Sequence, residues 1–314
     1  MPTENKILMY LRHFLEYLEI EKGRSQLTVR NYDFYLRRFI HWSKLTKPED
    51  ITLEIVRNFR LFLNRLVWQN KTLKKSTQNY HLIALRSFLK YLAKHDVKTL
   101  ASEKIELAKV GERVVDFLEG SDLDRILGAP FKTQQPEIIQ LRDKAILETL
   151  FSTGLRVSEL ANLNQNSINL AKDEFTVRGK GDKPRMVFLS DQAKYAVKQY
   201  LAKRKDLNPA LFVGHDRAQK SREKKQEQQL VSNLTPRSIQ RLIEKYTRVA
   251  GLTKHVTPHT LRHSYATDLL RNGADIRSVQ TMLGHASITT TQIYTHVTNE
   301  QLKETYKKFH GKSN

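Results

Sequence analysis

The sequence predicts a mainly α-helical protein in two domains, with one small antiparallel sheet in the second domain. Apolar residues recur at the spacing of an amphipathic helix through most of the chain. Only one pair of neighbouring segments, residues 174–178 and 185–189, has a convincing β-strand pattern. A polar stretch with weak periodicity, residues 98–115, divides the chain into residues 1–97 and 116–314. We therefore expect a helical domain, a linker and a larger mixed domain, for which 314 residues are sufficient.

The first domain is expected to be a compact four-helix bundle, because its connections are short. Its apolar stripes cover residues 7–20, 32–40, 53–68 and 80–92. Basic residues lie between the stripes: Arg30, Arg37, Arg38, Lys74, Lys75, Arg86 and Lys90. Each one alone is well explained by a solvated polar face. As a set they suit phosphate contacts, which fix the register of a protein on a nucleic acid.

The chain carries a net charge of +21. Such an excess attracts polyanions, and nucleic acid is the first candidate. An anionic membrane surface is an alternative, but we find no long apolar run, signal peptide or lipidation motif, so we expect no membrane partner. A third interpretation is that the lysines only solvate the surface. The absence of cysteine excludes thiol catalysis, disulfides and cysteine-based zinc sites, and it fits the reducing cytoplasm, where we expect the protein to be.

Arg156 stands at a predicted helix start in the second domain. A helix over residues 141–151 stops at Gly154, and another begins near Val157. A buried helix N-terminus attracts anions, and a guanidinium adds a planar fork that matches phosphate. Glu159, one turn later, either orients Arg156 through an ion pair or is simply a favourable acid in the first turn.

Lys180 lies in the loop GKGDKP, which joins the two predicted strands. The flanking Gly179 and Gly181 allow this loop to bring an ammonium group to a substrate and to withdraw it. The alternative is an ordinary exposed lysine in a hairpin. A charged segment at residues 215–229 is expected to be a surface loop.

Residues 257–297 contain most of the remaining candidates. Thr257 and Pro258 signal a helix start, and His259 and Arg262 share one face of that helix because they are three residues apart. Further on, Gly273 and Gly284 fit helix ends. His285 directly follows the second of these glycines, and Tyr294 lies in the segment after it.

Two arginines, a lysine, two histidines and a tyrosine form a set suited to phosphoryl transfer. Its members are Arg156, Lys180, His259, Arg262, His285 and Tyr294. We find no carboxylate cluster of the kind that holds Mg²⁺, so we expect neither a metal ion nor another cofactor. Cationic side chains can stabilise a pentacoordinate phosphorane. A tyrosine, with a pKa of about 10, needs such a cationic field or a base to become a nucleophile.

Two other interpretations of the histidines stay open at this point. His259 or His263 can be a packed core histidine. His259, His263 and His285 can also form a zinc site, although the surroundings are basic and an acidic ligand is missing.

Four separated motifs resemble those of the tyrosine recombinase, or integrase, family in order and spacing. They are FSTGLR at 151–156, RGKGDKPR at 178–185, HTLRHSYAT at 259–267 and MLGHASITTTQIYTHV at 282–297. The first domain is similar to the family's SAM-like core-binding domain, and the second to its α/β catalytic domain. Because we expect no arm-binding domain before the bundle, the chain looks more like the Xer-type site-specific recombinases than the lambda-like phage integrases.

The resemblance implies a role for each site residue. Tyr294 would attack the scissile phosphate to form a 3′-phosphotyrosine bond, on a route that passes through a Holliday junction. Arg156 and Arg262 would hold the nonbridging oxygens, and Lys180 would protonate the leaving 5′ oxygen. His259 would assist proton transfer at the tyrosine.

His285 would donate a hydrogen bond to the phosphate in the transition state. Among the twelve tyrosines of the chain, Tyr265 and Tyr306 lie close in sequence to Tyr294. Only its spacing after Leu283-Gly284-His285 distinguishes Tyr294 from them. The chain departs from the family pattern in its long charged loop and in lacking a proline before Leu118.

The resemblance also implies partners. We expect double-stranded DNA with two inverted half-sites, and a homotetramer, or a heterotetramer with a paralogue, in the synapse. A terminal helix at 299–309 would dock into a neighbouring protomer. Resolution of chromosome or plasmid dimers, with a DNA translocase as a further partner, is the expected task. The alternatives are integration of a mobile element, a type IB topoisomerase, and a DNA-binding protein with an inactive site.

Overall fold

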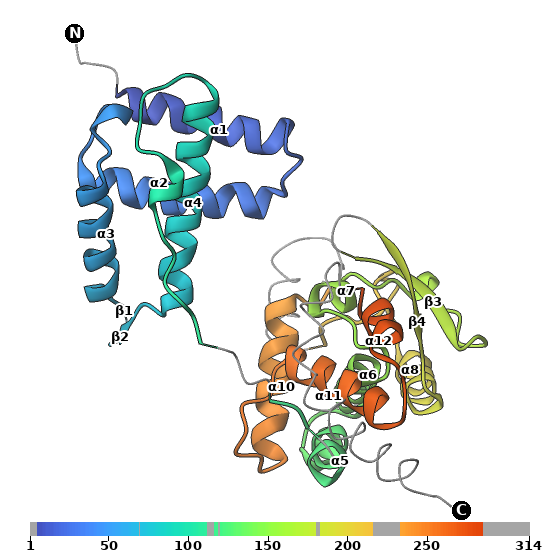
Figure 1. Ribbon diagram of the computed structural model, residues 1–314. Coiled ribbons are helices and arrows are strands. Elements are labelled where there is room, and N and C mark those ends of the chain that lie inside the picture. Colours follow the sequence, from blue (N-terminus) through green and yellow to red (C-terminus); the bar gives the residue numbers. More distant parts are fainter. Residues whose placement is uncertain are drawn as a thin grey trace, which may run out of the picture. The chain divides into compact units, whose positions relative to one another are not determined.

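The computed structural model describes residues 5–68, 70–111, 116–118, 120–179, 183–215 and 233–284. The chain divides into two compact units, Met1–Arg113 and Val114–Asn314. We call them the helical unit and, after the domain that it resembles in sequence, the catalytic unit. Both are mostly helical, and the catalytic unit contains a small antiparallel sheet (Figure 1). The predicted fold class is therefore confirmed. None of the helices within the described ranges is long and apolar enough to cross a membrane.

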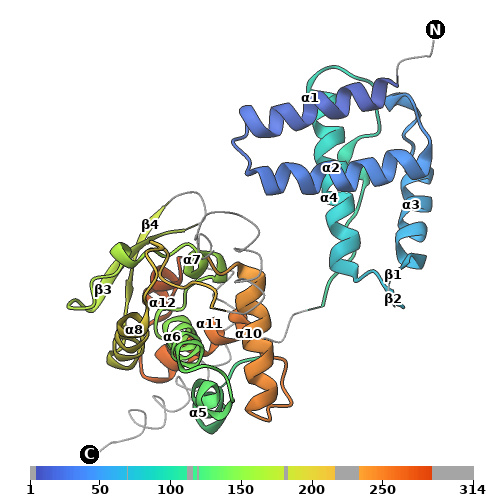
Figure 2. The same ribbon diagram turned by 180° about the vertical axis from the view of Figure 1, so that it is seen from behind.

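The helical unit is built from α1 (Lys6–Ile20), α2 (Gln26–Ser43), α3 (Leu53–Arg65) and α4 (Lys75–Lys94). Ser25 begins α2, since its hydroxyl accepts a hydrogen bond from the backbone N–H of Thr28 at 3.3 Å. Helices α1 and α2 pack side by side, and α4 crosses both (Figures 1 and 2). Their apolar faces meet in a core that contains Phe14, Phe59 and Phe88.

Helix α3 is shorter than predicted. The apolar stripe predicted a helix to residue 68, but α3 ends at Arg65. Two-residue strands follow, β1 (Val67–Trp68) and β2 (Lys71–Thr72), which pair as a small antiparallel hairpin. Asn70 lies in the turn with a φ of 59°, a left-handed conformation that asparagine tolerates better than most residues.

The first part of the segment predicted as a linker packs on the helical unit. Ile105 is 1% exposed and belongs to the core of this unit. The side chain of Asn79 donates to the carbonyl of Ala108 at 2.8 Å and accepts from its backbone N–H at 3.1 Å. The chain is therefore fixed to the helical unit as far as residue 108.

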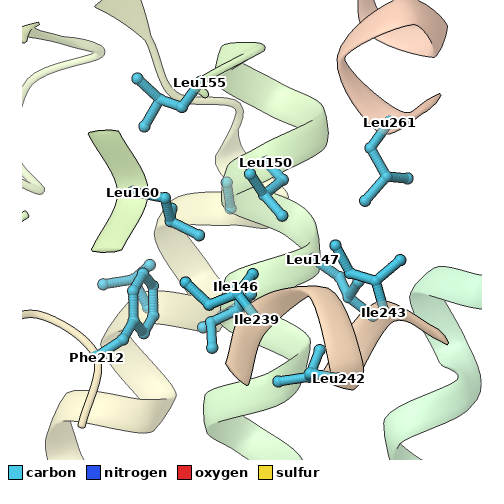
Figure 3. Packing of buried hydrophobic residues seen from close by; sticks show 14 of the residues in the cluster. Ile146, Leu147, Leu150, Leu155, Leu160, Phe212, Ile239, Leu242, Ile243 and Leu261 are labelled. Carbon is cyan, nitrogen blue, oxygen red and sulfur yellow. The ribbon is translucent and has the colours of Figure 1, made fainter. Parts of the chain in front are cut away.

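The catalytic unit is organised around α6 (Glu137–Thr153). It packs against α5 (Gly120–Gly128), α8 (Asp191–Lys203) and α11 (Pro258–Arg271). Leu147 and Leu150 of α6 lie in one cluster with Ile243 of α10 (Pro236–Val249) and Leu261 of α11 (Figure 3). Burial of apolar side chains such as these is the main driving force for folding.

The predicted strand pair forms as β3 (Glu174–Arg178) and β4 (Pro184–Phe188). Glu174 lies opposite Phe188, and Arg178 lies opposite Pro184. The apolar side chains Phe175 and Val177 are buried, and residues on either side of them point to solvent. The loop between the strands, residues 180–182, lies outside the described residues, as do most of the charged segment and the terminal helix expected at 299–309.

Glycines end the helices that lead to the candidate site. Helix α6 ends at Gly154 with a φ of 59°, and α12 (Ile276–Leu283) ends at Gly284 with a φ of 64°. Both helix ends were predicted from the sequence, because a glycine takes up the left-handed conformation without strain. Thr257 and Pro258 begin α11 as predicted, with the Thr257 hydroxyl accepting from the backbone N–H of Thr260 at 3.1 Å.

Candidate active site

Three of the six predicted site residues lie in the described part of the chain. Arg156 is the N-cap residue of α7 (Val157–Ala161), and His259 and Arg262 are on α11. Lys180, His285 and Tyr294 lie outside the described residues. The geometry below therefore concerns the two arginines, His259 and the groups around them.

Arg156 is held by Glu159 in two ways. Its backbone N–H donates to Glu159 Oε2 at 2.8 Å, and its guanidinium Nη1 donates to Glu159 Oε1 at 2.9 Å. Glu159 therefore combines the two roles considered from the sequence, since it caps the first turn of α7 and also orients the arginine. The Arg156 side chain remains 28% exposed.

Glu159 has a second arginine partner that the sequence analysis did not single out. Arg185, on β4, donates from Nη1 to Oε1 at 2.8 Å and from Nη2 to Oε2 at 2.7 Å. This is the bidentate geometry that makes arginine–carboxylate pairs strong. Burial disfavours the charged form of Glu159, but hydrogen bonds from Arg185 and Arg156 outweigh burial and lower its pKa to about 2.

Arg262 is buried, with 4% exposure. Its Nη1 donates to the carbonyl of Gly154 and its Nη2 donates to the carbonyl of Leu283 at 2.5 Å. Arg262 therefore ties the end of α6 to the end of α12. It places a positive charge at the C-terminal end of α12.

The three arginines meet at the C-terminal end of α12. Consecutive backbone carbonyls accept from different guanidinium groups: Met282 from Arg185 at 3.2 Å, Leu283 from Arg262, and Gly284 from Arg156 at 3.2 Å. The C-terminal end of a helix carries partial negative charge, so cations are favourable there. We call Arg156, Arg185 and Arg262 the arginine clamp. It brings residues from three separated motifs to one point, immediately before residue 285.

A hollow of about 700 Å³ opens beside Arg156. Its lining includes Ser158, Arg178 and Gly179. Gly179 directly precedes the predicted general acid, Lys180, in the sequence. The last described residue before this lysine therefore lines the hollow.

The remaining groups near the arginine clamp differ in accessibility. His259 is exposed in the first turn of α11. Tyr265 is only 8% exposed, and its hydroxyl donates to the sulfur of Met282 at 3.6 Å. Burial raises the pKa of Tyr265, an effect that the nearby Arg262 and Arg185 only partly oppose. Tyr265 is therefore poorly suited to be a nucleophile.

Known proteins match this chain along nearly its whole length. The profile of the Phage integrase family matches residues 116–301, and that of the Phage integrase N-terminal SAM-like domain matches residues 11–96. Tyrosine recombinase XerC of Thermodesulfovibrio yellowstonii is 35% identical over 311 residues, which cover 96% of each chain. The chain belongs to the tyrosine recombinase family. Such a recombinase is an enzyme that acts site-specifically on DNA, as the sequence predicted.

Further relatives are Xer proteins too. Tyrosine recombinase XerD of Oceanobacillus iheyensis is 35% identical over 314 residues, covering 96% of this recombinase and 98% of the relative. Among solved structures, the XerH site-specific recombinase bound to palindromic difH substrate has a TM-score of 0.74 at 22% identity, covering 97% and 96% of the two chains. The Tn1549 transposon integrase in complex with transposon right end DNA has a TM-score of 0.71 at 19% identity, covering 96% and 99%. The two structures share the fold of this recombinase.

Proposed function

We propose that this recombinase cuts and rejoins DNA strands through a 3′-phosphotyrosine bond on Tyr294, and that exchange proceeds through a Holliday junction. The observation that carries the proposal is the meeting of Arg156 and Arg262 at the carbonyls of Gly284 and Leu283. These arginines come from separate motifs, yet both donate to the two residues that precede His285 in the sequence. The predicted phosphate-holding groups therefore lie at the last described residues before the predicted nucleophile in the sequence.

In the proposed reaction, the Tyr294 oxygen attacks the phosphorus while the bond from phosphorus to the 5′ oxygen breaks. Arg156 and Arg262 stabilise the negative charge of the phosphorane, which gives transition-state stabilisation without a metal ion. Lys180 gives its proton to the leaving 5′ oxygen. His259 assists proton transfer at Tyr294, and His285 donates to a phosphate oxygen. A 5′-hydroxyl then attacks the phosphotyrosine, so rejoining needs no ATP.

The proposed substrate is double-stranded DNA with two inverted half-sites. The net charge of +21 and the basic residues on α2 and α4 of the helical unit support this choice. We propose that a homotetramer, or a heterotetramer with a paralogue, forms the synapse, with the terminal segment 299–309 exchanged between protomers. The Xer names of the relatives favour dimer resolution, with a translocase as a further partner, over integration of a mobile element.

The test is a suicide substrate, a duplex half-site with a nick that traps the covalent intermediate. We expect wild-type protein to become attached to the DNA in EDTA, and Tyr294→Phe to bind the DNA without attachment. Tyr265→Phe is the matched control. Because Tyr265 is buried, this substitution should leave attachment unchanged. Attachment through a tyrosine other than Tyr294, or a strict requirement for Mg²⁺, would overturn the mechanism.

A full site with two half-sites tests the exchange step. We expect synaptic tetramers and Holliday junctions with wild-type protein. Relaxation of supercoils without junctions would indicate a topoisomerase instead. A chain that ends at residue 298 should lose the tetramer, and if it keeps both tetramers and recombination, the proposal for segment 299–309 is wrong.

A further inference from the structure

Arg185 is placed to hold other groups of the proposed active site and not to hold the substrate. Three of its N–H donors are used: Nη1 and Nη2 on Glu159, and Nε on the carbonyl of Met282. Its side chain is 8% exposed, against 28% for Arg156. All three guanidinium nitrogens of Arg185 therefore already donate to acceptors within the protein.

Glu159 is the group through which Arg185 reaches Arg156. Its Oε1 accepts from the guanidinium groups of both arginines, and its Oε2 accepts from Arg185 Nη2 and from the backbone N–H of Arg156. With Arg156 alone, the carboxylate would cancel the charge of the arginine that faces the hollow. With both arginines the group keeps one net positive charge, since two cations share one anion.

The stem of Arg185 also lies against the end of α12. A Cβ atom placed on Gly284 would be 2.8 Å from Arg185 Cδ, and the φ of Gly284 is 64°. The hydrogen bond from Nε to Met282 holds the same helix end two residues earlier. Arg185 therefore contacts the last residues of α12 through both its stem and its head, directly before the chain continues to residue 285.

We propose that Arg185 is a positioning residue of this recombinase: it fixes Arg156 through Glu159 and fixes the end of α12, so that both are in place before DNA is cut. The inference rests on the proposed function for its effect on cleavage. Loss of Arg185 should slow cleavage and leave DNA affinity near the wild-type value. Substitution of a residue that contacts DNA phosphate would instead lower the affinity for DNA.

The test compares Arg185→Gln and Arg185→Lys with wild-type protein. Arg277→Gln is the matched control, because Arg277 is an exposed arginine of α12 that lies outside the arginine clamp. Single-turnover cleavage of the nicked substrate at saturating protein should fall roughly 10²-fold in Arg185→Gln, the size expected when a catalytic group is displaced by about 1 Å. Arg185→Lys should recover little of this loss, because an ammonium cannot make the bidentate pair.

Two readouts separate positioning from general loss of stability. The double variant Glu159→Gln/Arg185→Gln should be little slower than Arg185→Gln, because both changes break one pathway. Cleavage by Arg185→Gln should also be lost at a higher pH than cleavage by wild-type protein, since Glu159 loses the hydrogen bonds from Arg185 that lower its pKa and takes up a proton more readily. Additive losses and an unchanged pH profile would overturn the proposal, as would equal losses of affinity and cleavage.

Hydrogen exchange tests the same role without DNA. Amides at the end of α12, residues 280–284, should exchange faster in Arg185→Gln than in wild-type protein or Arg277→Gln. Unchanged exchange there would contradict the proposal. If wild-type protein forms no covalent DNA complex, the proposed function fails, while this measurement still decides whether Arg185 holds the helix end.

Discussion

The guanidinium of Arg262 and the carbonyl of Leu283 are joined by a hydrogen bond of 2.5 Å, made by a buried side chain to the last residue of α12. Leu283 is followed by Gly284 and then by the segment with His285 and Tyr294. A residue predicted only as a phosphate ligand therefore also has a structural role. The two roles lead to separate expectations.

Arg262→Ala should destabilise the catalytic unit as well as abolish cleavage. Two buried carbonyls, of Gly154 and Leu283, lose their partner, which should cost roughly 2–4 kcal/mol of unfolding free energy. Urea unfolding followed by circular dichroism measures this cost. Both tryptophans, Trp42 and Trp68, belong to the helical unit. Tryptophan fluorescence therefore reports the unfolding of the helical unit, which Arg262→Ala should leave unchanged. A stable variant that is merely inactive would contradict the structural role.

Glu159 should make the stability of the catalytic unit depend on acid pH. Its pKa is about 2 in the folded protein against an ordinary value of 4.5, so the unfolded chain takes up the proton first as the pH falls. The contribution of the Glu159 carboxylate to the unfolding free energy is complete above pH 4.5 and is lost as the pH falls towards 2. It amounts to about 3 kcal/mol. The difference in unfolding free energy between wild-type protein and Glu159→Gln should shrink over this range. A constant difference would show that the pairing with Arg185 does not hold in solution.

His81 should give the helical unit a pH dependence nearer neutrality. Nδ1 lies 2.9 Å from the carbonyl of Thr77 and must donate, so Nε2 accepts from Arg38 at 3.2 Å. Burial and, less strongly, the charge of Arg38 lower the pKa of His81. As the pH falls below about 6.5, the unfolded chain is protonated first, and stability is lost. Tryptophan fluorescence in urea should detect this loss between pH 7 and pH 5, and His81→Gln should reduce it.

Tyr246 offers a variant that affects stability but not chemistry. Its hydroxyl donates to Asp143 Oδ2 at 2.7 Å, within a buried group in which Arg142 also donates to Asp143 at 2.8 Å. Tyr246→Phe removes one donor from a buried carboxylate and should cost roughly 1–3 kcal/mol of unfolding free energy. Cleavage per folded molecule should be unchanged, because Tyr246 has no contact with the arginine clamp among the described interactions. A specific loss of cleavage would show that this network reaches the site.

The sequence predicted those parts of the fold that local chemistry determines. The glycine helix ends at Gly154 and Gly284 and the cap at Thr257 are present. The strand pair predicted at 174–178 and 185–189 forms at 174–178 and 184–188. Each depends on residues a few positions apart. The roles of the six predicted site residues remain predictions, although two of these residues, Arg156 and Arg262, meet in space.

The features missed from the sequence depend on distant residues. Arg185 lies 26 residues after Glu159 and ends the same motif as Lys180, whose loop position attracted attention first. The contacts of Arg185 depend on the packing of β4, α7 and α12 against one another. Helical or strand periodicity in the sequence does not indicate this packing. The packing of Ile105 on the helical unit was hidden similarly, because the few apolar residues of this polar stretch give only a weak periodic signal.

The reciprocal hydrogen bonds between Asn79 and Ala108 have a practical consequence for building chimaeras. Exchanging helical units between relatives requires a junction that leaves each core complete. A crossover at residue 98 would pair Ile105 from one parent with a core that was shaped by the other. A crossover after residue 108 keeps residues 98–108 with the helical unit on which they pack, and hybrids joined there should fold with the thermal stability of their parents.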